Sequence, residues 1–348
     1  MKKRKRIVHV MHADKFTEPF ISFIEENFDF AAHHFIVPLD DKYLIKLRRN
    51  MTHMFLQRGF LKEMGVSLKA LYSSDKIILH GLFVRNVVYM LFLQPWLLKK
   101  CYWVMWGGDL YHYLNRPHDF GSNLYERVRS VVIRRIGHVV TYVKGDYELA
   151  KKWYGIGGQF HECLMYPSNT FEGHVLPSNK GKTIKILVGN SADPSNNHFE
   201  IFNKISSQGN KDFLIYCPLS YGSVAYAEEV AQKGKELFGD RFVALRELTP
   251  LKQYMELLSE VDIAVFAHKR QQGMGNVIAL LGMGKRVFMR KDVTPYKLFK
   301  ELGISVFDVN EMDFMPLGDA LRKKNQIRIN SFFSKAALVE QWKRIFQG

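Results

Sequence analysis

The stretch KILVGNSADPSNNH, residues 185–198, is the most informative about the fold class. An apolar, β-branched run ends at Gly189, small polar residues follow, and a helical pattern begins near Asn197. A strand that passes through such a loop into a helix is the repeating unit of a parallel α/β sheet. Backbone N–H groups at the start of the helix favour phosphate, and ligands of such sheets bind beyond the carboxyl ends of the strands. The stretch therefore predicts either a phosphate-binding corner or a simple capped helix after a tight loop.

The same alternation of strand and helix patterns extends along the chain in both directions. Strands are predicted at Ile7–Met11, His34–Pro38, Lys76–His80, Tyr102–Trp106, His138–Val143, Ile184–Gly189, Phe213–Cys217, Arg241–Leu245, Ile263–Phe266 and Arg286–Met289. Helices are predicted at Pro19–Asn27, Leu82–Leu98, Leu124–Arg135, Asn197–Ser207, Ala225–Phe238, Leu251–Ser259 and Asn276–Met283. This order predicts an α/β protein with two Rossmann-like, doubly wound parallel-sheet domains that face each other across a cleft.

The composition supports two domains and places a boundary near the middle of the chain. A chain of 348 residues, 47% of them hydrophobic, is long enough for two cores. Residues 169–182 are polar and contain Pro177, which is typical of a linker. We expect an N-terminal domain at 1–168 and a second domain at 183–328. A C-terminal helix within 329–348 is expected to pack back on the first domain.

The charge of the chain indicates either an anionic partner or a well-solvated basic surface with no specific partner. The net charge is +16, and residues 1–170 contain 25 basic against 15 acidic residues. Nucleic acid, acidic lipid or a phosphorylated substrate would each suit such a surface. No RNP1-like pattern is present, which disfavours nucleic acid. The basic start MKKRKR suits an anionic leaflet, and three isolated cysteines without paired spacing suit a reducing cytoplasm.

The apolar segment at residues 82–98, LFVRNVVYMLFLQPWLL, raises the possibility of a membrane contact. Arg85, Asn86, Gln94 and Pro95 interrupt it, whereas a spanning helix needs about 20 mostly apolar residues. The segment is therefore interpreted as one helix that is buried in the core or lies in the plane of the membrane surface.

A second strand-to-helix corner is predicted at RQQGMGN, residues 270–276. Glycines let the backbone approach a ligand closely, and an arginine can neutralise a diphosphate. Neither the GxGxxG nor the GxxxxGK[ST] fingerprint is present, so nicotinamide chemistry and ATP hydrolysis are disfavoured. The two corners together predict a diphosphate site with the following donor-binding residues: Gly189, Asn190, Ser191, Asn196, Asn197, His198, Arg270, Gln271, Gln272, Gly273, Gly275 and Asn276.

Candidate catalytic and acceptor-binding residues lie past the predicted strand ends of the first half. Asp109 follows two glycines in WGGDLY, and Asp14 follows the first strand. A carboxylate at such a position can accept a proton from a sugar hydroxyl, so Asp109 is the first candidate for the base and Asp14 the second. The alternative interpretation is that Asp109 is a turn or helix-cap residue and that His80 is a hydrogen-bonded histidine near the core. The acceptor-binding candidates are His12, His80, Trp106 and Tyr111.

No Asp-x-Asp pair occurs in the sequence. Sugar transferases that depend on a metal commonly hold it with such a pair. We therefore expect neither a metal site nor another cofactor, and we expect helix N-termini and cationic side chains to stabilise the leaving diphosphate.

These motifs resemble glycosyltransferase family 56, the TDP-N-acetylfucosamine:lipid II N-acetylfucosaminyltransferases. The similarity rests on VHV at residues 8–10 followed by Asp14, HG at 80–81, WGGDLY at 106–111, GD at 145–146, ILVGNSADPSNNH at 186–198 and RQQGMG at 270–275, with a weaker FFS at 332–334 and Trp342. The family pattern WGADLY reads WGGDLY here, and residues 40–75 match no motif of the family.

The resemblance implies a peripheral enzyme of GT-B fold at the cytoplasmic face of the plasma membrane. Its donor would be a thymidine-diphosphate 4-acetamido-4,6-dideoxygalactose. Its acceptor would be a polyprenyl-diphosphate-linked glycan of bacterial surface polysaccharide assembly. Two alternatives remain from the residues alone: a nucleotide-sugar epimerase of the same fold, and a basic nucleic-acid-binding protein.

Overall fold

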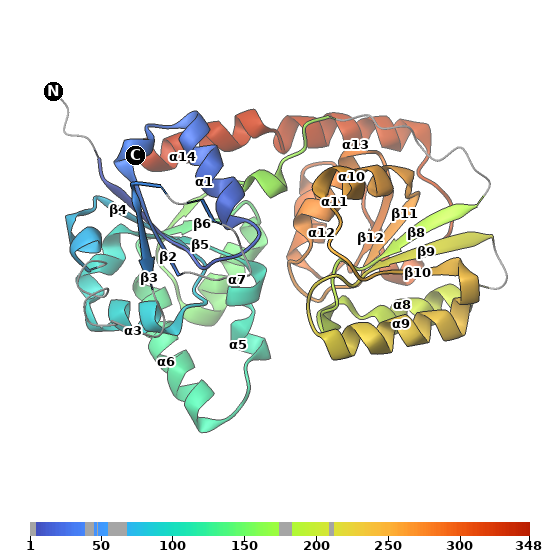
Figure 1. Cartoon of the computed structure of the whole chain (residues 1–348), viewed down its shortest axis with the longest axis horizontal. Coiled ribbons are helices and arrows are strands. Elements are labelled where there is room, and N and C mark those ends of the chain that lie inside the picture. The colour runs from blue at the N-terminus through green and yellow to red at the C-terminus, as the bar shows by residue number, and fades with distance from the viewer. Residues whose placement is uncertain (1–4, 39–44, 47, 55–67, 174–182, 209–211) are drawn as a thin grey trace. The chain divides into compact units, whose positions relative to one another are not determined.

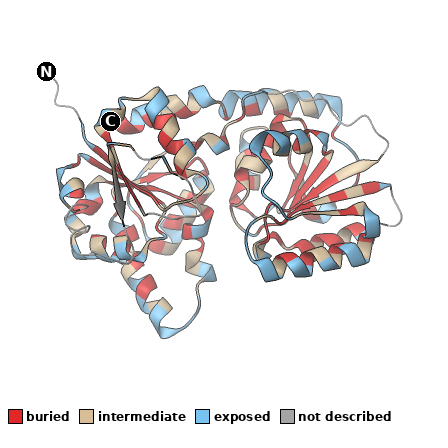
Figure 2. Cartoon of the chain, viewed as in Figure 1, coloured by how far each residue is buried: buried red, intermediate tan, exposed pale blue. Residues whose placement is uncertain are grey.

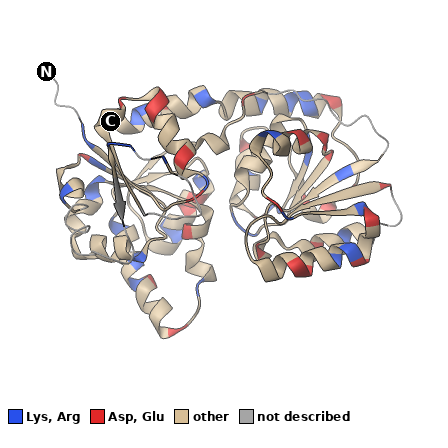
Figure 3. Cartoon of the chain, in the orientation of Figure 1, with Lys and Arg blue, Asp and Glu red and all other residues tan. Residues whose placement is uncertain are grey.

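The computed structural model describes residues 5–38, 45–46, 48–54, 68–173, 183–208 and 212–348. The chain forms two compact units (Figure 1). Unit 1 contains residues 1–168 and 335–348, and unit 2 contains residues 169–334. Lysine and arginine residues are distributed over both units (Figure 3).

Unit 1 is built on a parallel sheet of seven strands in the order β3-β2-β1-β4-β5-β6-β7. The order reverses direction between β1 and β4, which is the position where ligands bind in doubly wound sheets. The strands are β1 (Ile7–Val10), β2 (His33–Pro38), β3 (Met51–Met54), β4 (Lys76–His80), β5 (Cys101–Val104), β6 (His138–Val140) and β7 (Gln159–His161). The strands β1, β4 and β5 are buried throughout, because helices cover both faces of a parallel sheet.

The helices of unit 1 differ from prediction most informatively at residues 82–100. The helix predicted over Leu82–Leu98 is wrong as a single element: α3 (Arg85–Leu93) ends at Gln94, and a 3₁₀ helix, η2 (Pro95–Lys100), follows. Proline lacks the N–H that would continue the helix and restricts the residue before it. The other α-helices are α1 (Thr17–Asn27), α4 (Gly107–Leu110), α5 (His112–Asn115), α6 (Phe120–Arg135), α7 (Lys144–Tyr154) and α14 (Lys335–Gln347).

Unit 2 repeats the same design with a parallel sheet of six strands in the order β10-β9-β8-β11-β12-β13. The strands are β8 (Ile184–Val188), β9 (Phe213–Pro218), β10 (Phe242–Leu245), β11 (Ile263–Phe266), β12 (Arg286–Met289) and β13 (Phe307–Asp308). The helices are α8 (His198–Ser206), α9 (Val224–Phe238), α10 (Leu251–Glu260), α11 (Met274–Gly282), α12 (Thr294–Glu301) and α13 (Asp319–Phe332). Figure 2 shows that the strands of this unit are largely buried and that its helices are exposed on their outer sides.

The predicted C-terminal helix is two helices. The chain leaves α13 at Phe333, and α14 begins at Lys335 and belongs to unit 1. Trp342 in α14 is fully buried, and its indole donates a hydrogen bond to the carbonyl of Met165, 2.9 Å away. The return of the chain end to the first sheet therefore starts at residue 335 rather than 329.

The predicted fold class is confirmed: both units are doubly wound parallel α/β structures. Among the described elements, three strands and five α-helices were not predicted, namely β3, β7, β13, α4, α5, α7, α12 and α13. The missed strands, MTHM, QFH and FD, contain no run of apolar β-branched or aromatic residues, which is the signal that identifies a strand. Within the described ranges no helix is long and apolar enough to cross a membrane.

Candidate active site

The carboxyl ends of β1, β4 and β5 bring three of the predicted segments of unit 1 to one edge of the sheet. Strand β1 pairs with β4, and β4 pairs with β5, so the loops that follow them are neighbours. These loops carry His12, Asp14, His80, Trp106 and Asp109. The topology thus groups the predicted catalytic and acceptor residues, and the individual side chains then differ in what they contact.

Asp109 is buried and hydrogen-bonded through both carboxylate oxygens. Its Oδ1 accepts the backbone N–H of Trp106 at 2.8 Å, at the start of α4. Its Oδ2 accepts the N–H of Leu82 at 3.0 Å and the indole N–H of Trp103 at 2.7 Å. Burial raises the pKa of Asp109, and the nearby Arg129 and the three donors oppose that shift. The carboxylate thereby ties together the loops after β4 and β5, and its position does not support the first choice of base.

Asp14 instead forms a pair with His12. The Asp14 Oδ2 lies 3.0 Å from His12 Nε2, and the side chains are 16% and 28% exposed, so the pair is reachable from solvent. The other oxygen, Oδ1, accepts the N–H groups of Phe16 and Thr17 at the start of α1. Burial raises the pKa of Asp14, but its hydrogen bonds, above all that with His12, outweigh burial and hold it below its ordinary value. An ionised carboxylate that orients an exposed imidazole is a common arrangement for a general base.

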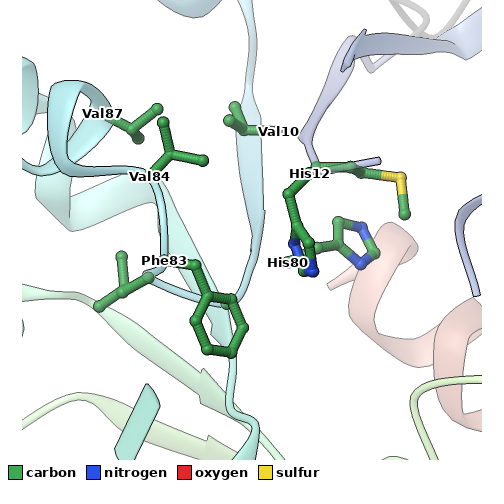
Figure 4. A pocket seen from close by; sticks show the side chains of 9 residues that line it. Val10, His12, His80, Phe83, Val84 and Val87 are labelled. Atoms are coloured by element: carbon green, nitrogen blue, oxygen red, sulfur yellow. The ribbon is translucent and has the colours of Figure 1, made fainter. Parts of the chain in front are cut away.

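A small hollow of about 10 Å³ lies beside this pair (Figure 4). Residues 10–12 from the end of β1, residues 80–84 from the end of β4, and Val87 line it. Phe83 stands 5.1 Å from the His12 ring in an edge-on arrangement, and Trp106 stands 5.8 Å from it. The imidazole of His12 is thus framed by two aromatic rings at the carboxyl edge of the sheet.

His80, predicted to bind the acceptor, belongs to a buried chain of hydrogen bonds. Its Nδ1 lies 2.7 Å from the Tyr166 hydroxyl and its Nε2 lies 3.1 Å from His9 Nδ1, and His9 Nε2 lies 2.9 Å from His33 Nδ1. The indole of Trp106 donates to the same hydroxyl at 3.1 Å. Since this hydroxyl already accepts from Trp106, it can donate to His80, and each imidazole then donates to the next.

Burial keeps His9, His80 and Tyr166 of this chain uncharged. It lowers the pKa of His9 well below its ordinary value and that of His80 to about 3, and it raises the pKa of Tyr166. Both ring nitrogens of His80 are engaged, so its predicted contact with an acceptor is not what the structure favours. The sequence reasoning missed Tyr166, His9 and His33, because nothing local marks them as partners of His80.

The remaining acceptor candidates are Trp106 and Tyr111. Trp106 is partly exposed beside His12, in agreement with a contact to substrate. Tyr111 is buried in the core of unit 1, with its ring 5.2 Å from Trp153. The prediction that Tyr111 stacks on a sugar is therefore not supported by its position.

In unit 2 the loop after β8 is organised around the buried amide of Asn196. Its Oδ1 accepts the backbone N–H of Asn190 at 2.9 Å, and its Nδ2 donates to Ser191 Oγ at 3.1 Å. Asn197 adopts a left-handed conformation with φ 53° at the start of α8, and its side chain donates to the carbonyl of Ala267. Gly189 also has a positive φ, 71°, and an added Cβ would lie 2.6 Å from His198 Nε2. The predicted corner is therefore a preformed turn that needs these residue types.

The loop after β11 joins this corner, as the sequence predicted for a shared diphosphate site. Gln272 lies 2.7 Å from Ser195 Oγ, and its Nε2 lies 3.5 Å from Asn190 Oδ1. His268, which was not predicted, places Nε2 2.8 Å from Asn196 Oδ1. It lies two residues past the end of β11, and the position of a polar residue at a strand end is the signal that singled out the candidates of the first half. Gly273, with φ 64°, starts α11, and an added Cβ would meet Asn190 at 3.1 Å.

Arg270 and Asn276 lie in or beside the same loop. Arg270 donates from Nη1 to the carbonyl of Gln271, 3.2 Å away, and is only partly buried. Asn276 donates to the Tyr254 hydroxyl at 2.9 Å, and Gly275 is the second residue of α11. The loop therefore places a guanidinium next to the first turn of a helix, which is a suitable arrangement for a phosphate.

Two buried polar atoms of these loops have no hydrogen-bond partner within the described part of the chain. They are Nε2 of His198 and Oε1 of Gln271. Buried polar atoms normally have partners, so such atoms commonly mark a place where a ligand or water binds. Burial lowers the pKa of His198 to about 4 and, together with Arg270, that of His268 to about 3, so both rings are neutral at pH 7. They act as hydrogen-bonding groups rather than as charges.

A metal site does not emerge from the residues that the structure describes. Among them, no three histidine, cysteine, aspartate or glutamate side chains are grouped so that they could hold a metal ion. Arg270 is a cationic group beside the predicted diphosphate site. Burial raises the pKa of Asp193 in the loop after β8, but hydrogen bonds from Ser195 and the charge of Arg270 outweigh burial and lower it.

Comparison with known proteins identifies a family and a fold. The family model of the 4-alpha-L-fucosyltransferases, glycosyl transferase group 56, matches residues 7–347. Similar solved structures include sucrose-phosphate synthase from Thermosynechococcus elongatus (13% identity, TM-score 0.69, 99% of this chain and 98% of that one). Anabaena HepE in complex with UDP is also similar (11%, 0.67, 98% and 99%), as is the E. coli trehalose-6-phosphate protein bound with UDP-2-fluoro glucose (9%, 0.61, 99% and 98%). These similarities show the two-domain GT-B fold.

Proposed function

Since the chain belongs to the 4-alpha-L-fucosyltransferase family, glycosyl transferase group 56, and is a glycosyltransferase, we propose that it transfers a 6-deoxy amino sugar to a lipid-linked glycan. The donor is a nucleoside-diphosphate sugar, with thymidine diphosphate and a 4-acetamido-4,6-dideoxygalactose. This sugar shares the 6-deoxygalactose skeleton of fucose, the sugar in the family's description. The acceptor is a polyprenyl-diphosphate-linked glycan of bacterial surface polysaccharide assembly, met at the cytoplasmic face of the plasma membrane.

The observation that carries the donor assignment is the junction of two strand-to-helix corners in unit 2. Hydrogen bonds Ser195–Gln272, Asn196–His268 and Asn197–Ala267 fasten the loop after β8 to the loop after β11. The junction brings the start of α11 beside Arg270 and leaves His198 Nε2 and Gln271 Oε1 unsatisfied. A diphosphate with its attached sugar supplies the negative charge and the hydroxyl groups that these elements can bind.

The base in this proposal is His12, oriented by Asp14. The ionised carboxylate accepts a hydrogen bond from the Nε2–H of the ring and leaves Nδ1 able to accept the proton of the acceptor hydroxyl. The hydroxyl oxygen then attacks the anomeric carbon as the bond to the diphosphate breaks. Trp106, which contacts the His12 ring edge-on, offers an aromatic surface for the acceptor sugar.

Arg270 and the N-terminus of α11 stabilise the departing diphosphate without a metal ion in this proposal. The sequence contains no Asp-x-Asp pair. A guanidinium and backbone N–H groups can instead neutralise the charge that develops on the leaving group. Full activity in the presence of a chelator is the expected result.

The experiment that tests the function combines the purified protein, a panel of TDP- and UDP-sugars and a polyprenyl-diphosphate-linked disaccharide in detergent. Mass spectrometry should detect an acceptor extended by one deoxy amino sugar. Conversion of the free donor in the absence of acceptor would instead identify an epimerase and overturn the proposal.

Matched variants test His12 as the base and Arg270 as the residue that binds the donor diphosphate. His12→Ala should lower turnover at least 100-fold with the donor dissociation constant within twofold of wild type, by the usual scale for a general base. Arg270→Ala should instead weaken donor binding or slow the release of the nucleotide, and the neighbouring Lys269→Ala serves as its control. Exposed His118→Ala is the control for His12. A His12→Ala protein with wild-type turnover would remove His12 and Asp14 from the mechanism.

A further inference from the structure

Unit 1 contains a second hollow, of about 520 Å³, that none of the groups discussed above lines. It lies between the chain that leaves α5 and one side of α6. We call it the arginine pocket, and its polar lining is Tyr113, Arg116, Asn123, Glu126, Arg127, Ser130 and Arg134.

The sequence of α6 places the polar residues of the pocket on one side of that helix. Asn123, Arg127, Ser130 and Arg134 are separated by four, three and four residues, which is the spacing of one helical face. Arg116, just after α5, adds a third guanidinium from the opposite side. Three cations from two elements therefore converge on one concave surface.

This positive charge is not neutralised within the described part of the chain. No carboxylate there forms an ion pair with Arg116, Arg127 or Arg134. The single acidic residue of the lining, Glu126, is buried, and it is engaged by His112 at 2.8 Å and Arg129 at 3.4 Å.

The hydrogen-bonding capacity of the three arginines is also largely unused. Arg116 bonds the carbonyl of Tyr113 through Nη1, but its Nε is buried without a partner among the described residues. Arg134 uses Nε for the carbonyl of Tyr154 and leaves its terminal nitrogens available. Converging guanidiniums with spare N–H groups are the usual means of binding phosphate, because each can donate two parallel hydrogen bonds.

Apolar side chains on the same two helices project into solvent around the pocket. Leu114 in α5 and Phe120 and Leu124 in α6 are each more than half exposed, and Phe120 is 85% exposed. Large apolar side chains grouped in this way commonly mark an interaction surface. A free phosphate ion would use the arginines but would leave these apolar groups in water.

Helix α3 and the turn after it also expose residues that are typical of membrane interfaces. Helix α3 packs against α6, where the Tyr89 and Tyr125 rings lie 5.7 Å apart. Leu93 at its end is 71% exposed, and the exposed indole of Trp96 donates to the Tyr72 hydroxyl at 3.0 Å. Trp and Tyr favour the headgroup region, since each combines an apolar ring with a polar group.

We propose that the arginine pocket binds the phosphate group of a lipid in a membrane surface, while Leu114, Phe120 and Leu124 enter the apolar layer beside it. The lipid is an anionic amphiphile, whose headgroup matches the cations and whose chains match the apolar rim. The inference deepens the proposed function, because a lipid-linked acceptor presents such a phosphate. Binding of lipid by the arginine pocket can nevertheless be measured without any transfer reaction.

Vesicle flotation of the full-length protein tests the pocket. The three vesicle types are phosphatidylcholine alone, phosphatidylcholine with phosphatidylglycerol, and phosphatidylcholine with farnesyl diphosphate at equal surface charge. The wild-type protein should bind both charged types at least tenfold more strongly than the neutral one. Stronger binding to one charged type identifies the source of the phosphate as bulk phospholipid or as an isoprenoid diphosphate.

A matched pair of variants distinguishes binding in the arginine pocket from general electrostatic attraction to the vesicle. Arg127→Gln removes a pocket residue, whereas Arg135→Gln removes the same charge from an exposed position of the same helix outside the pocket. We expect Arg127→Gln to weaken binding at least fivefold and Arg135→Gln to change it less than twofold. Equal losses of vesicle binding in the two variants would contradict the proposal that the arginine pocket binds the lipid.

The apolar rim has its own test. Phe120→Ser with Leu124→Ser should weaken binding to charged vesicles at least tenfold without lowering the melting temperature, because both side chains are already exposed. Unchanged vesicle binding of this double variant would contradict the proposal that a lipid is the ligand. The same conclusion would follow if the wild-type protein bound inorganic pyrophosphate but none of the vesicles. The catalytically impaired His12→Ala protein should bind vesicles like wild type, so failure of the proposed reaction and failure of the pocket are distinguishable.

Discussion

The indole of Trp342 donates its N–H to the carbonyl of Met165 at 2.9 Å, across 177 residues of sequence. Met165 has φ 70°, a left-handed conformation that is rare for a side chain other than glycine. The neighbouring Gln341 accepts the N–H of Leu164 at 2.8 Å. The C-terminal helix α14 therefore holds the strained turn that places Tyr166 beside His80 and Trp106.

Trp342→Phe should destabilise unit 1 by about 1–3 kcal/mol, because it leaves the Met165 carbonyl without its donor and reduces the buried volume. Urea unfolding measures the effect. Lys343→Ala, at an exposed position of the same helix, should stay within about 0.5 kcal/mol of wild type. A Trp342→Phe protein as stable as the Lys343→Ala protein would show that the turn at Met165 does not depend on the hydrogen bond from Trp342.

Asp109→Asn should lower the melting temperature, because an amide offers one acceptor oxygen where the carboxylate accepts three N–H groups with two. The expected cost is about 1–3 kcal/mol, measured by thermal unfolding. Asp119→Asn is the control, since Asp119 caps α6 from an exposed position and asparagine caps equally well. If Asp109→Asn left the stability unchanged but lowered turnover at least 100-fold, Asp109 would again be the first candidate for the base.

Stability should fall as the pH drops below about 6.5. His9, His80, His198 and His268 have pKa values lowered by burial, to about 3 for His80 and His268 and about 4 for His198. In the unfolded chain these rings take up protons below their ordinary pKa, whereas in the native protein they stay neutral, so acid favours unfolding.

Urea unfolding at pH 7.5, 6.5 and 5.5 measures this dependence. Each buried histidine should contribute up to about one proton to the slope of unfolding free energy against pH. His268→Gln should reduce the slope, and exposed His118→Gln should leave it unchanged. A flat profile between pH 7.5 and 5.5 would contradict neutral burial of these rings.

Gly189→Ala should abolish the donor-induced thermal shift measured with UDP- or TDP-sugars. Its Cβ would lie 2.6 Å from His198 Nε2 and 2.8 Å from Asn196 Oδ1 and would displace the corner. Gly239→Ala is the matched control, because Gly239 also has a positive φ but an added Cβ meets nothing within 4 Å. Both variants bear backbone strain of about 1 kcal/mol, and only the first should lose the ligand. Equal thermal shifts in the two variants would contradict the donor assignment.

The sequence by itself determined the doubly wound class and the two corners of unit 2. Helix and strand periods and the glycine and asparagine turns after β8 and β11 are local properties, and loops after neighbouring parallel strands necessarily share an edge. The short strands β3, β7 and β13 could not be predicted from the sequence, because pairing with neighbouring strands, rather than their own residue pattern, makes them strands.

Only the tertiary structure decided which polar side chains at the sheet edge are available to a substrate. Asp109, His80 and Asp14 all lie at or just past a strand end, yet Leu82 and Trp103 engage the first, and His9 and Tyr166 engage the second. Asp14 alone has an oxygen directed at the exposed imidazole of His12. Burial and hydrogen-bond partners come from residues distant in sequence, so the identity of a residue and its place after a strand do not determine whether it is free to react.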